Sequence, residues 1–199
     1  MGTSTMIDIM GAIIIGGYLL LNVLSFQGRT TEQMYYFNDD VIVQRHLADV
    51  SGIIEHDFRK IGYCADPMRL PDPSKAILAA DSTSIAFLSD YDANGTPDTV
   101  RYTLGPINAL TATPNPRDRV LVRSISGTAG QQVEHICTAF RLIYYNALNA
   151  RIPFPITTPR EIYMIQIAVA VESPSAYHED YPVAYWQQFR LASRNLRNR

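Results

Sequence analysis

Charged residues are scarce in this chain of 199 amino acids, and cysteine and histidine are scarcer still. Asp, Glu, Lys and Arg make up 18% of the residues, against about a quarter in typical soluble domains. The net charge of −2 gives no basic field to attract nucleic acid, so no nucleic-acid partner is predicted. The GxSxG, HExxH, GxGxxG and P-loop patterns are all absent. The sequence therefore predicts no catalytic residues and a protein that is not an enzyme.

The two cysteines are Cys64 and Cys137, and their spacing fits neither a zinc site nor a CxxC redox pair. In an oxidising compartment, a disulfide between them would close a long loop and stabilise the fold by about 3–5 kcal/mol. The alternative is two buried thiols, because a sequence does not show whether two sulfur atoms lie within bonding distance.

One long apolar segment near the N-terminus accounts for much of the shortage of charge. From Ile9 to Phe26 the chain reads IMGAIIIGGYLLLNVLSF, without a charged residue. With Met6 and Ile7 the segment has about 20 residues, or about 30 Å as a helix, which matches the hydrocarbon core of a bilayer. Residues 1–8 hold no Lys or Arg, and no clear A-x-A cleavage site follows. We therefore predict a retained single-pass anchor rather than a cleaved signal peptide.

Several residues of this segment bear on assembly. Asp8 lies at its edge, where a carboxylate can interact with the helix N-terminus at the membrane surface or pair with a cation of a neighbouring subunit, such as a free amine. Small residues allow helices to approach closely in a membrane. We expect helix packing to involve Gly11, Ile13, Gly16 and Gly17.

The helical pattern continues beyond the membrane-length segment. Apolar residues recur mostly at intervals of three or four, at Met34, Phe37, Val41, Leu47, Val50, Ile54, Phe58 and Ile61. The first proline is Pro67. The pattern predicts a nearly continuous helix over residues 3–61, loosened near residues 27–31, whose second half presents one apolar face to a globular domain.

After Gly62 the sequence changes to short alternating runs separated by turns. The predicted strands are residues 76–80, 84–88, 99–104, 119–125, 134–145, 162–171 and 184–191. Period-two alternation with turn-rich connections favours an antiparallel sheet. The predicted fold is therefore α+β, with a long N-terminal helix packed on an antiparallel sheet. Its parts are a membrane helix (residues 1–28), an amphipathic helix (residues 29–62) and a β-rich domain (residues 63–199).

The sharpest local motif is DYDANGTPD, over residues 90–98. Oxygen-bearing side chains at alternate positions, followed by glycine, can wrap a hard cation such as calcium. The predicted ligands are the side chains of Asp90, Asp92, Asn94 and Asp98 and the carbonyl of Thr96. An EF-hand would have Glu at the twelfth position, where this chain has Arg101. The alternative is a plain hairpin turn, for which Asp, Asn and Gly supply the backbone angles.

Three stretches of the chain form a recognisable set. They are MGTSTMIDIMGAIIIGGYLLLNVL at the N-terminus, IEHDFRKIGYCAD at the end of the predicted helix and IAFLSDYDANGTPDTVRYTLG around the acidic loop. The set resembles the type IV pilin and pseudopilin superfamily, especially larger minor components of the J-type pseudopilin and W-type minor pilin kind. The resemblance implies a pilin-like fold whose apolar helices bundle in a filament core, with the β domains as the outer layer.

The resemblance also implies processing after a glycine, and Gly2 is the matching position. Members of the family normally have an aromatic or hydrophobic first residue and a Glu at the fifth position of the mature chain. Here cleavage after Gly2 makes Thr3 the first residue and Ile7 the fifth, with Asp8 one place late. The leader would be Met-Gly alone, without the usual basic residues.

From this resemblance we predict a structural subunit, of the minor rather than the major kind, of a type IV pilus-like filament or a type II secretion pseudopilus. Its partners would be the inner membrane and other pilin-like subunits, identical or different. The β domain would lie outside the cytoplasm, in a periplasmic or cell-surface filament. The alternative is a monomeric, membrane-tethered extracytoplasmic binding module, with a platform of tyrosines such as Tyr177, Tyr181 and Tyr185.

Overall fold

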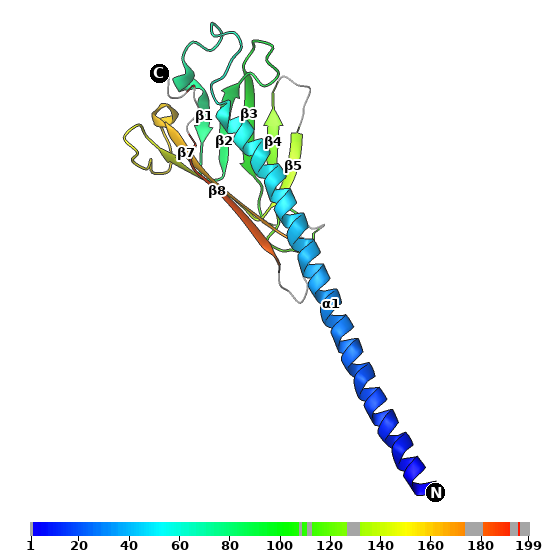
Figure 1. Ribbon diagram of the computed structural model, residues 1–199. Helices are drawn as coiled ribbons and strands as arrows, with labels where there is room; N and C mark the ends of the chain where they lie inside the picture. Colours follow the sequence, from blue (N-terminus) through cyan, green and yellow to red (C-terminus); the bar gives the residue numbers. More distant parts are fainter. Residues whose placement is uncertain are drawn as a thin grey trace. The chain divides into compact units, whose positions relative to one another are not determined.

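The computed structural model describes residues 2–107, 109–110, 113–126, 132–173, 181–191 and 195. The chain divides into two compact units, residues 1–41 and residues 42–199. The division falls inside the segment that the sequence assigns to an amphipathic helix, residues 29–62. The second unit contains all the strands described below and the last turns of the long helix (Figure 1).

Helix α1 runs from Gly2 to Arg59 without interruption, which confirms the continuous helix expected over residues 3–61. The helix also continues through residues 27–31, where loosening was expected. There the hydroxyls of Thr30 and Thr31 donate to the carbonyls of Phe26 and Gln27, at 3.0 and 2.9 Å. These bonds satisfy polar side chains within the helix itself, so they need no external partner.

Gly62 turns the chain away from the end of α1. Its φ of 74° is left-handed, a conformation that a side chain disfavours and that commonly follows a helix. Its N–H donates to the carbonyl of Leu88 at 2.9 Å, which ties the turn to a strand. A Cβ added here would lie 3.3 Å from the Cβ atoms of Pro73 and Ala76, so the position also lacks room.

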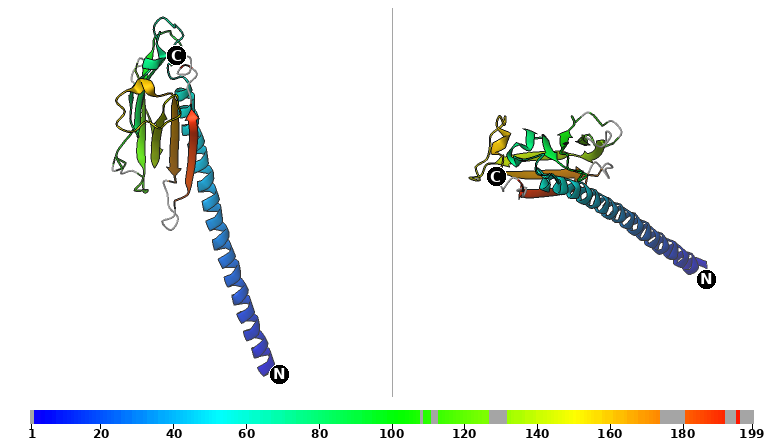
Figure 2. Two further views of the ribbon diagram at one scale, coloured as in Figure 1. Left: turned by 90° about the vertical axis from the view of Figure 1, so that its left-hand side faces the viewer. Right: turned by 90° about the horizontal axis from the view of Figure 1, so that it is seen from above.

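The strands form two antiparallel sheets. The five-stranded sheet has the order β1 (Ile77–Ala80), β2 (Ser84–Ser89), β3 (Asp98–Leu104), β4 (Arg119–Ile125) and β5 (Gln132–Cys137). The three-stranded sheet has the order β6 (Ala139–Tyr145), β7 (Met164–Glu172) and β8 (Val183–Leu191). Two short 3-10 helices, η1 (Pro73–Lys75) and η2 (Pro159–Glu161), lie in the connections. Figure 2 shows these elements in two further views.

The α+β architecture with antiparallel strands is confirmed, but the run predicted as one strand over residues 134–145 is two strands. The break falls at Thr138, whose N–H donates to the carbonyl of Ala170 in β7 at 2.9 Å. Strand β5 pairs with β4, whereas β6 pairs with β7. The chain therefore passes from one sheet to the other at this residue, a change of partner that the alternation of side chains does not reveal.

The core is formed by one face of α1 and the inner faces of both sheets. The helix contributes Val43, Leu47, Val50, Ile54 and Phe58, all buried. The ring of Phe58 lies 5.5 Å from that of Phe87 and 5.6 Å from that of Tyr102, measured between centroids. Tyr102 in turn stacks on Phe140 of the other sheet at 6.2 Å. These aromatic contacts join α1 to both sheets.

We expect Phe58→Ala to lower the stability of the second unit sharply. The side chain of Phe58 is fully buried, and truncation of a buried Phe costs about 3–5 kcal/mol. For a domain of this size the melting temperature should fall by roughly 6–20 °C, measured by circular dichroism on the full chain in detergent.

The matched control for Phe58 is Ile42→Ala, on the same helix but 52% exposed. It should shift the melting temperature by about 1–2 °C at most. Equal shifts for the two variants would contradict the assigned packing face of α1.

Candidate functional site

The first unit exposes a large apolar surface. Between residues 6 and 26 of α1, fourteen large apolar residues are each at least 53% exposed: Met6, Ile7, Ile9, Met10, Ile13, Ile14, Ile15, Tyr18, Leu19, Leu20, Leu21, Val23, Leu24 and Phe26. Soluble monomers rarely expose contiguous apolar patches above a few hundred Å². The segment is long and apolar enough to cross a membrane, and none of it is buried. The surface therefore requires lipid or other apolar helices.

The residues predicted to mediate assembly all lie in this unit. Asp8 and Ile13 are exposed on α1. A Cβ added to Gly11, Gly16 or Gly17 would meet no atom within 4 Å. These glycines therefore serve no close contact within the described part of the chain, and their role in helix association stays a prediction.

The acidic loop connects β2 to β3, and Asp90 organises it. The carboxylate of Asp90 is buried and accepts hydrogen bonds from the backbone N–H groups of Asn94, Gly95 and Ala65, at 3.0, 2.9 and 2.9 Å. Burial acts to raise the pKa of Asp90, but these three bonds outweigh it and lower the pKa. Gly95, with a φ of 82°, supplies the left-handed turn. The hairpin alternative for this motif thus describes its backbone correctly.

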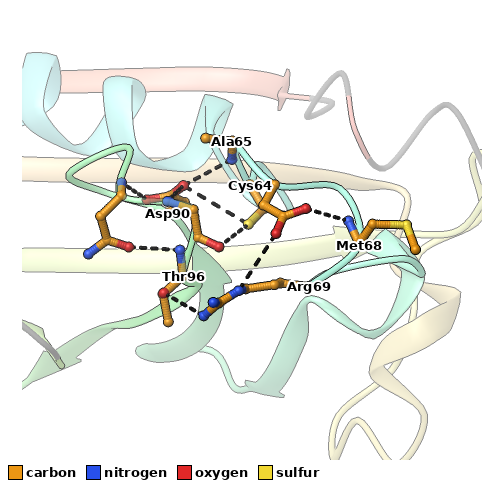
Figure 3. A network of polar contacts seen from close by, with 9 residues as sticks. Cys64, Ala65, Met68, Arg69, Asp90 and Thr96 are labelled. Carbon is orange, nitrogen blue, oxygen red and sulfur yellow. Dashed lines mark hydrogen bonds and ion pairs between the residues drawn. The ribbon is translucent and has the colours of Figure 1, made fainter.

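The same loop also forms hydrogen bonds with the segment that follows α1, residues 63–69 (Figure 3). The thiol of Cys64 donates to the carbonyl of Gly95 at 3.5 Å, and Arg69 donates to the hydroxyl of Thr96 at 2.9 Å. The N–H of Asp90 donates to the carbonyl of Tyr63 at 2.8 Å. Together with the bond from Ala65 to Asp90, these contacts hold the end of the helix against the β2–β3 connection.

Three predicted calcium ligands converge in this loop. Carboxylate oxygens of Asp90, Asp92 and Asp98 lie within 4.8 Å of one another. Burial raises the pKa of Asp98, and the charges of Asp92 and Asp90 raise it further, against a hydrogen bond from the N–H of Tyr91. A bound cation would relieve that repulsion, and hard oxygen ligands suit Ca²⁺. The donor set therefore fits a calcium ion, and the loop also closes without one.

The fourth predicted side-chain ligand, Asn94, is engaged inside the loop. The side-chain amide of Asn94 donates to Asp92 at 2.8 Å, and its oxygen accepts from the N–H of Thr96 at 2.7 Å. Calcium binding through Asn94 would compete with these bonds.

A buried ion pair joins α1 to the five-stranded sheet. Nε of Arg123 donates to Oδ2 of Asp57 at 2.6 Å, and its NH2 group donates to Oδ1 at 3.1 Å. The hydroxyl of Tyr102 donates to the same Oδ2 at 2.6 Å. Burial and the adjacent Asp57 charge raise the pKa of Tyr102 well above its usual value. The guanidinium also lies 5.0 Å from the ring of Tyr91.

This network was missed from the sequence, although a signal was present. Asp57 falls on the apolar face of α1, between the buried Ile54 and Phe58. A carboxylate in that position needs a buried partner. The identity of the partner was not readable, because Arg123 lies 66 residues away.

A small cavity of about 260 Å³ opens beside this network. Its lining residues are Gly52, Ile53, His56, Asp57, Tyr91, Arg123, Val133 and His135. Burial lowers the pKa of His135, as do the neighbouring His46 and Arg123. The cavity falls below the usual 300–1,000 Å³ of ligand pockets. We assign it no ligand.

Of the two alternatives for Cys64 and Cys137, the disulfide is wrong, because both cysteines are free. Cys64 contacts the loop that joins β2 to β3. Cys137 pairs with Arg119 at the start of β4, which lies at the opposite end of the sheet from that loop. Burial raises the pKa of the Cys137 thiol to about 12, so it is unreactive near neutral pH.

The proposed tyrosine platform is only partly described. Tyr177 lies outside the described residues. Tyr181 lies under the guanidinium of Arg117, 5.3 Å from ring centroid to CZ, and its hydroxyl donates to the carbonyl of Pro114 at 3.4 Å. Tyr185 is 58% exposed on β8. Tyr181 thus serves the packing of a loop, which leaves Tyr185 as the exposed ring.

No protein-family model matches this chain, and no curated protein or solved structure matches it either. Function must therefore be inferred from the exposed helix and from the chemistry of the second unit.

We expect Asp90→Asn and Asp92→Asn to separate the structural role of the loop from calcium binding. Asp90→Asn should lower the melting temperature with or without calcium, because it weakens three charge-assisted backbone bonds, each contributing about 1.5–3 kcal/mol. Asp92 is exposed, so Asp92→Asn should change stability little in the absence of calcium. If the loop binds calcium, titration calorimetry should show that Asp92→Asn weakens binding. If a double variant, Asp90→Asn with Asp92→Asn, released the same heat of calcium binding as wild type, calcium would not bind at this site.

We expect Asp57→Ala to destabilise the second unit by about 3–5 kcal/mol, because it leaves the Arg123 charge buried and unpaired. The control is Glu55→Ala, which removes a half-buried partner of the exposed Arg59 on the same helix. Its cost should be at most about 1 kcal/mol. Denaturant titration of the full chain in detergent measures both, and similar losses would mean that the Asp57 pair does not anchor α1.

Proposed function

We propose that this protein is a structural subunit, of the minor kind, of a type IV pilus-like filament or a type II secretion pseudopilus. The observation that supports this most is the exposed apolar surface of α1 in the first unit, from Met6 to Phe26. It is joined through one continuous helix to a folded α+β unit that has its own buried apolar core. A chain of this kind has an assembly or membrane segment and a separate soluble portion.

The energetics of the exposed segment favour association. Fully burying one Leu, Ile or Met side chain stabilises by about 1.5–3 kcal/mol relative to leaving it in water. Eleven of the fourteen exposed residues between Met6 and Phe26 are Leu, Ile or Met, and together they cannot remain in water in a stable native protein. They can be covered by lipid, and when the helix leaves the bilayer they must be covered by the helices of other subunits.

The order of elements supports a pilin-like fold. An apolar helix is followed by a helix that packs on an antiparallel meander, and an acidic loop connects β2 and β3. A second, three-stranded antiparallel sheet follows the meander. In this proposal the second unit lies outside the cytoplasm, in a periplasmic or surface filament, and partner subunits have similar apolar helices.

Two residue-level features extend the proposal. Asp8 is exposed beside the apolar segment and would either interact with the helix N-terminus or pair with a cation of the neighbouring subunit. Calcium would be held by the carboxylates of Asp90, Asp92 and Asp98, where it would add rigidity to the contacts between the β2–β3 loop and the segment that follows α1. Processing after Gly2 is a further part of this proposal.

A second candidate is a monomeric, membrane-tethered binding module. It is favoured by Val183 and Tyr185 of β8, which are exposed at the edge of the three-stranded sheet. An exposed aromatic ring at a sheet edge is a common feature of binding surfaces. This candidate predicts that the protein stays in membranes as a single copy.

The two candidates can be separated by shearing cells that make the protein. For the filament subunit, wild type should appear in the sheared, high-mass fraction, and Ile13→Lys should be lost from it, because a buried lysine cannot pack in an apolar helix bundle. Leu148→Lys is the control, since Leu148 is 88% exposed in a loop of the second unit. It should behave as wild type. Normal assembly of Ile13→Lys, or wild type confined to membranes, would contradict the filament proposal.

A further inference from the structure

The exposed surface of α1 in the first unit has two different sides. A polar stripe recurs at alternating intervals of four and three residues: Tyr18, Asn22, Ser25, Arg29, Glu32, Tyr36 and Asp39. The opposite side of the helix has a seam that is apolar except at Gln27 and Thr30, called here the apolar seam: Leu20, Val23, Gln27, Thr30, Met34, Phe37 and Val41. Both series repeat every 3.5 residues, the repeat of helices that supercoil around one another.

Lipid cannot cover the C-terminal part of the apolar seam, from Met34 to Val41. If residues 6–26 span the hydrocarbon core, Phe37 lies about 16 Å beyond it, at about 1.5 Å per residue. The interfacial layer on each side of the core is only about 5–8 Å thick. Met34, Phe37 and Val41 are nevertheless 68%, 73% and 48% exposed. These apolar side chains therefore need a protein partner.

The same part of the helix, residues 30–38, also lines an open groove. This groove of about 640 Å³ is lined by Thr30, Thr31, Gln33, Met34, Tyr35, Phe37 and Asn38. Three of these residues belong to the apolar seam, and Thr31, Gln33 and Asn38 directly flank it. Flanking and seam residues together make the holes that receive side chains of a facing helix in a coiled coil.

The distribution of charge indicates a second copy as the partner. Between Met6 and Val41 the charged residues are Asp8, Arg29, Glu32, Asp39 and Asp40. Arg29, Glu32 and Asp39 belong to the polar stripe, and Asp8 has the same phase. Asp40 alone flanks the apolar seam, and in a parallel pair the residue that faces it, five positions further along the other helix, is Arg45.

Gln27, a polar residue within the apolar seam, also suits a pair of identical helices. In a parallel pair in register, Gln27 of one helix faces Gln27 of the other, and the two side-chain amides can hydrogen-bond to each other. A polar residue at one seam position specifies register in such pairs. Copies inserted in the same membrane have the same orientation, which makes the pair parallel.

We infer that the apolar seam from Leu20 to Val41 binds the same seam of a second copy in a parallel, left-handed pair. This rests on the proposed function only in that copies lie side by side in the membrane. The inference specifies which side of α1 makes the contact. The polar stripe, on the opposite side of the helix, takes no part in this contact.

Disulfide crosslinking in membranes tests this inference. In a Cys64→Ser background, single cysteines are placed on the apolar seam (Met34→Cys, Phe37→Cys) and on the polar stripe (Arg29→Cys, Glu32→Cys). After oxidation with copper phenanthroline, the seam variants should give a band at twice 22.3 kDa, and the stripe variants should lack it. All four positions belong to one helical segment, so expression and insertion should match.

Three outcomes would overturn the inference: dimers from the stripe variants instead, no dimer from any variant, or a seam product whose mass is not twice that of the chain. The result is separable from the filament proposal. Sheared assemblies without seam crosslinks would overturn the paired seam alone. Seam crosslinks without sheared assemblies would support the pair and contradict the filament.

Discussion

The exclusion of apolar surface from water governs this protein more than any other interaction. Between Met6 and Phe26 the first unit leaves fourteen large apolar side chains uncovered on one helix, whereas the second unit has a buried apolar core. A single continuous helix, Gly2–Arg59, belongs to both units, so one element serves two environments. The proposal of an assembling membrane subunit follows from this difference between the exposed N-terminal part of α1 and the part that packs in the second unit.

The second unit holds its share of α1 by polar contacts as well as by packing. Asp57 is paired with Arg123 and Tyr102 inside the core, and this pairing fixes the helix against the five-stranded sheet. At the end of the helix, Asp90 accepts backbone bonds from two connections and joins them. A buried ion pair adds little net stability over apolar packing, but breaking it is costly, so it specifies the position of the helix. An assembly force on α1 would therefore be transmitted to the sheet through defined contacts.

Periodicity predicted most of the fold. Intervals of three and four predicted the long helix, and alternation found the strand segments, because burial on one face imposes those periods. It did not show the switch between sheets at Thr138, since β5 and β6 keep a strand pattern while they change partners. The acidic loop was found from its residue types, whereas the Asp57–Arg123 pair depends on contacts between distant segments. The disulfide alternative was wrong for the same reason, because the sequence does not give the distance between the sulfur atoms of Cys64 and Cys137.

The most direct test of the central claim is sedimentation of the native protein in detergent-free buffer, with its intact mass determined on the same sample. The account predicts that the chain retains residues 6–26 and sediments with membrane vesicles or as a large assembly. A freely soluble monomer that keeps this segment, or a native protein that has been trimmed of it, would contradict the account.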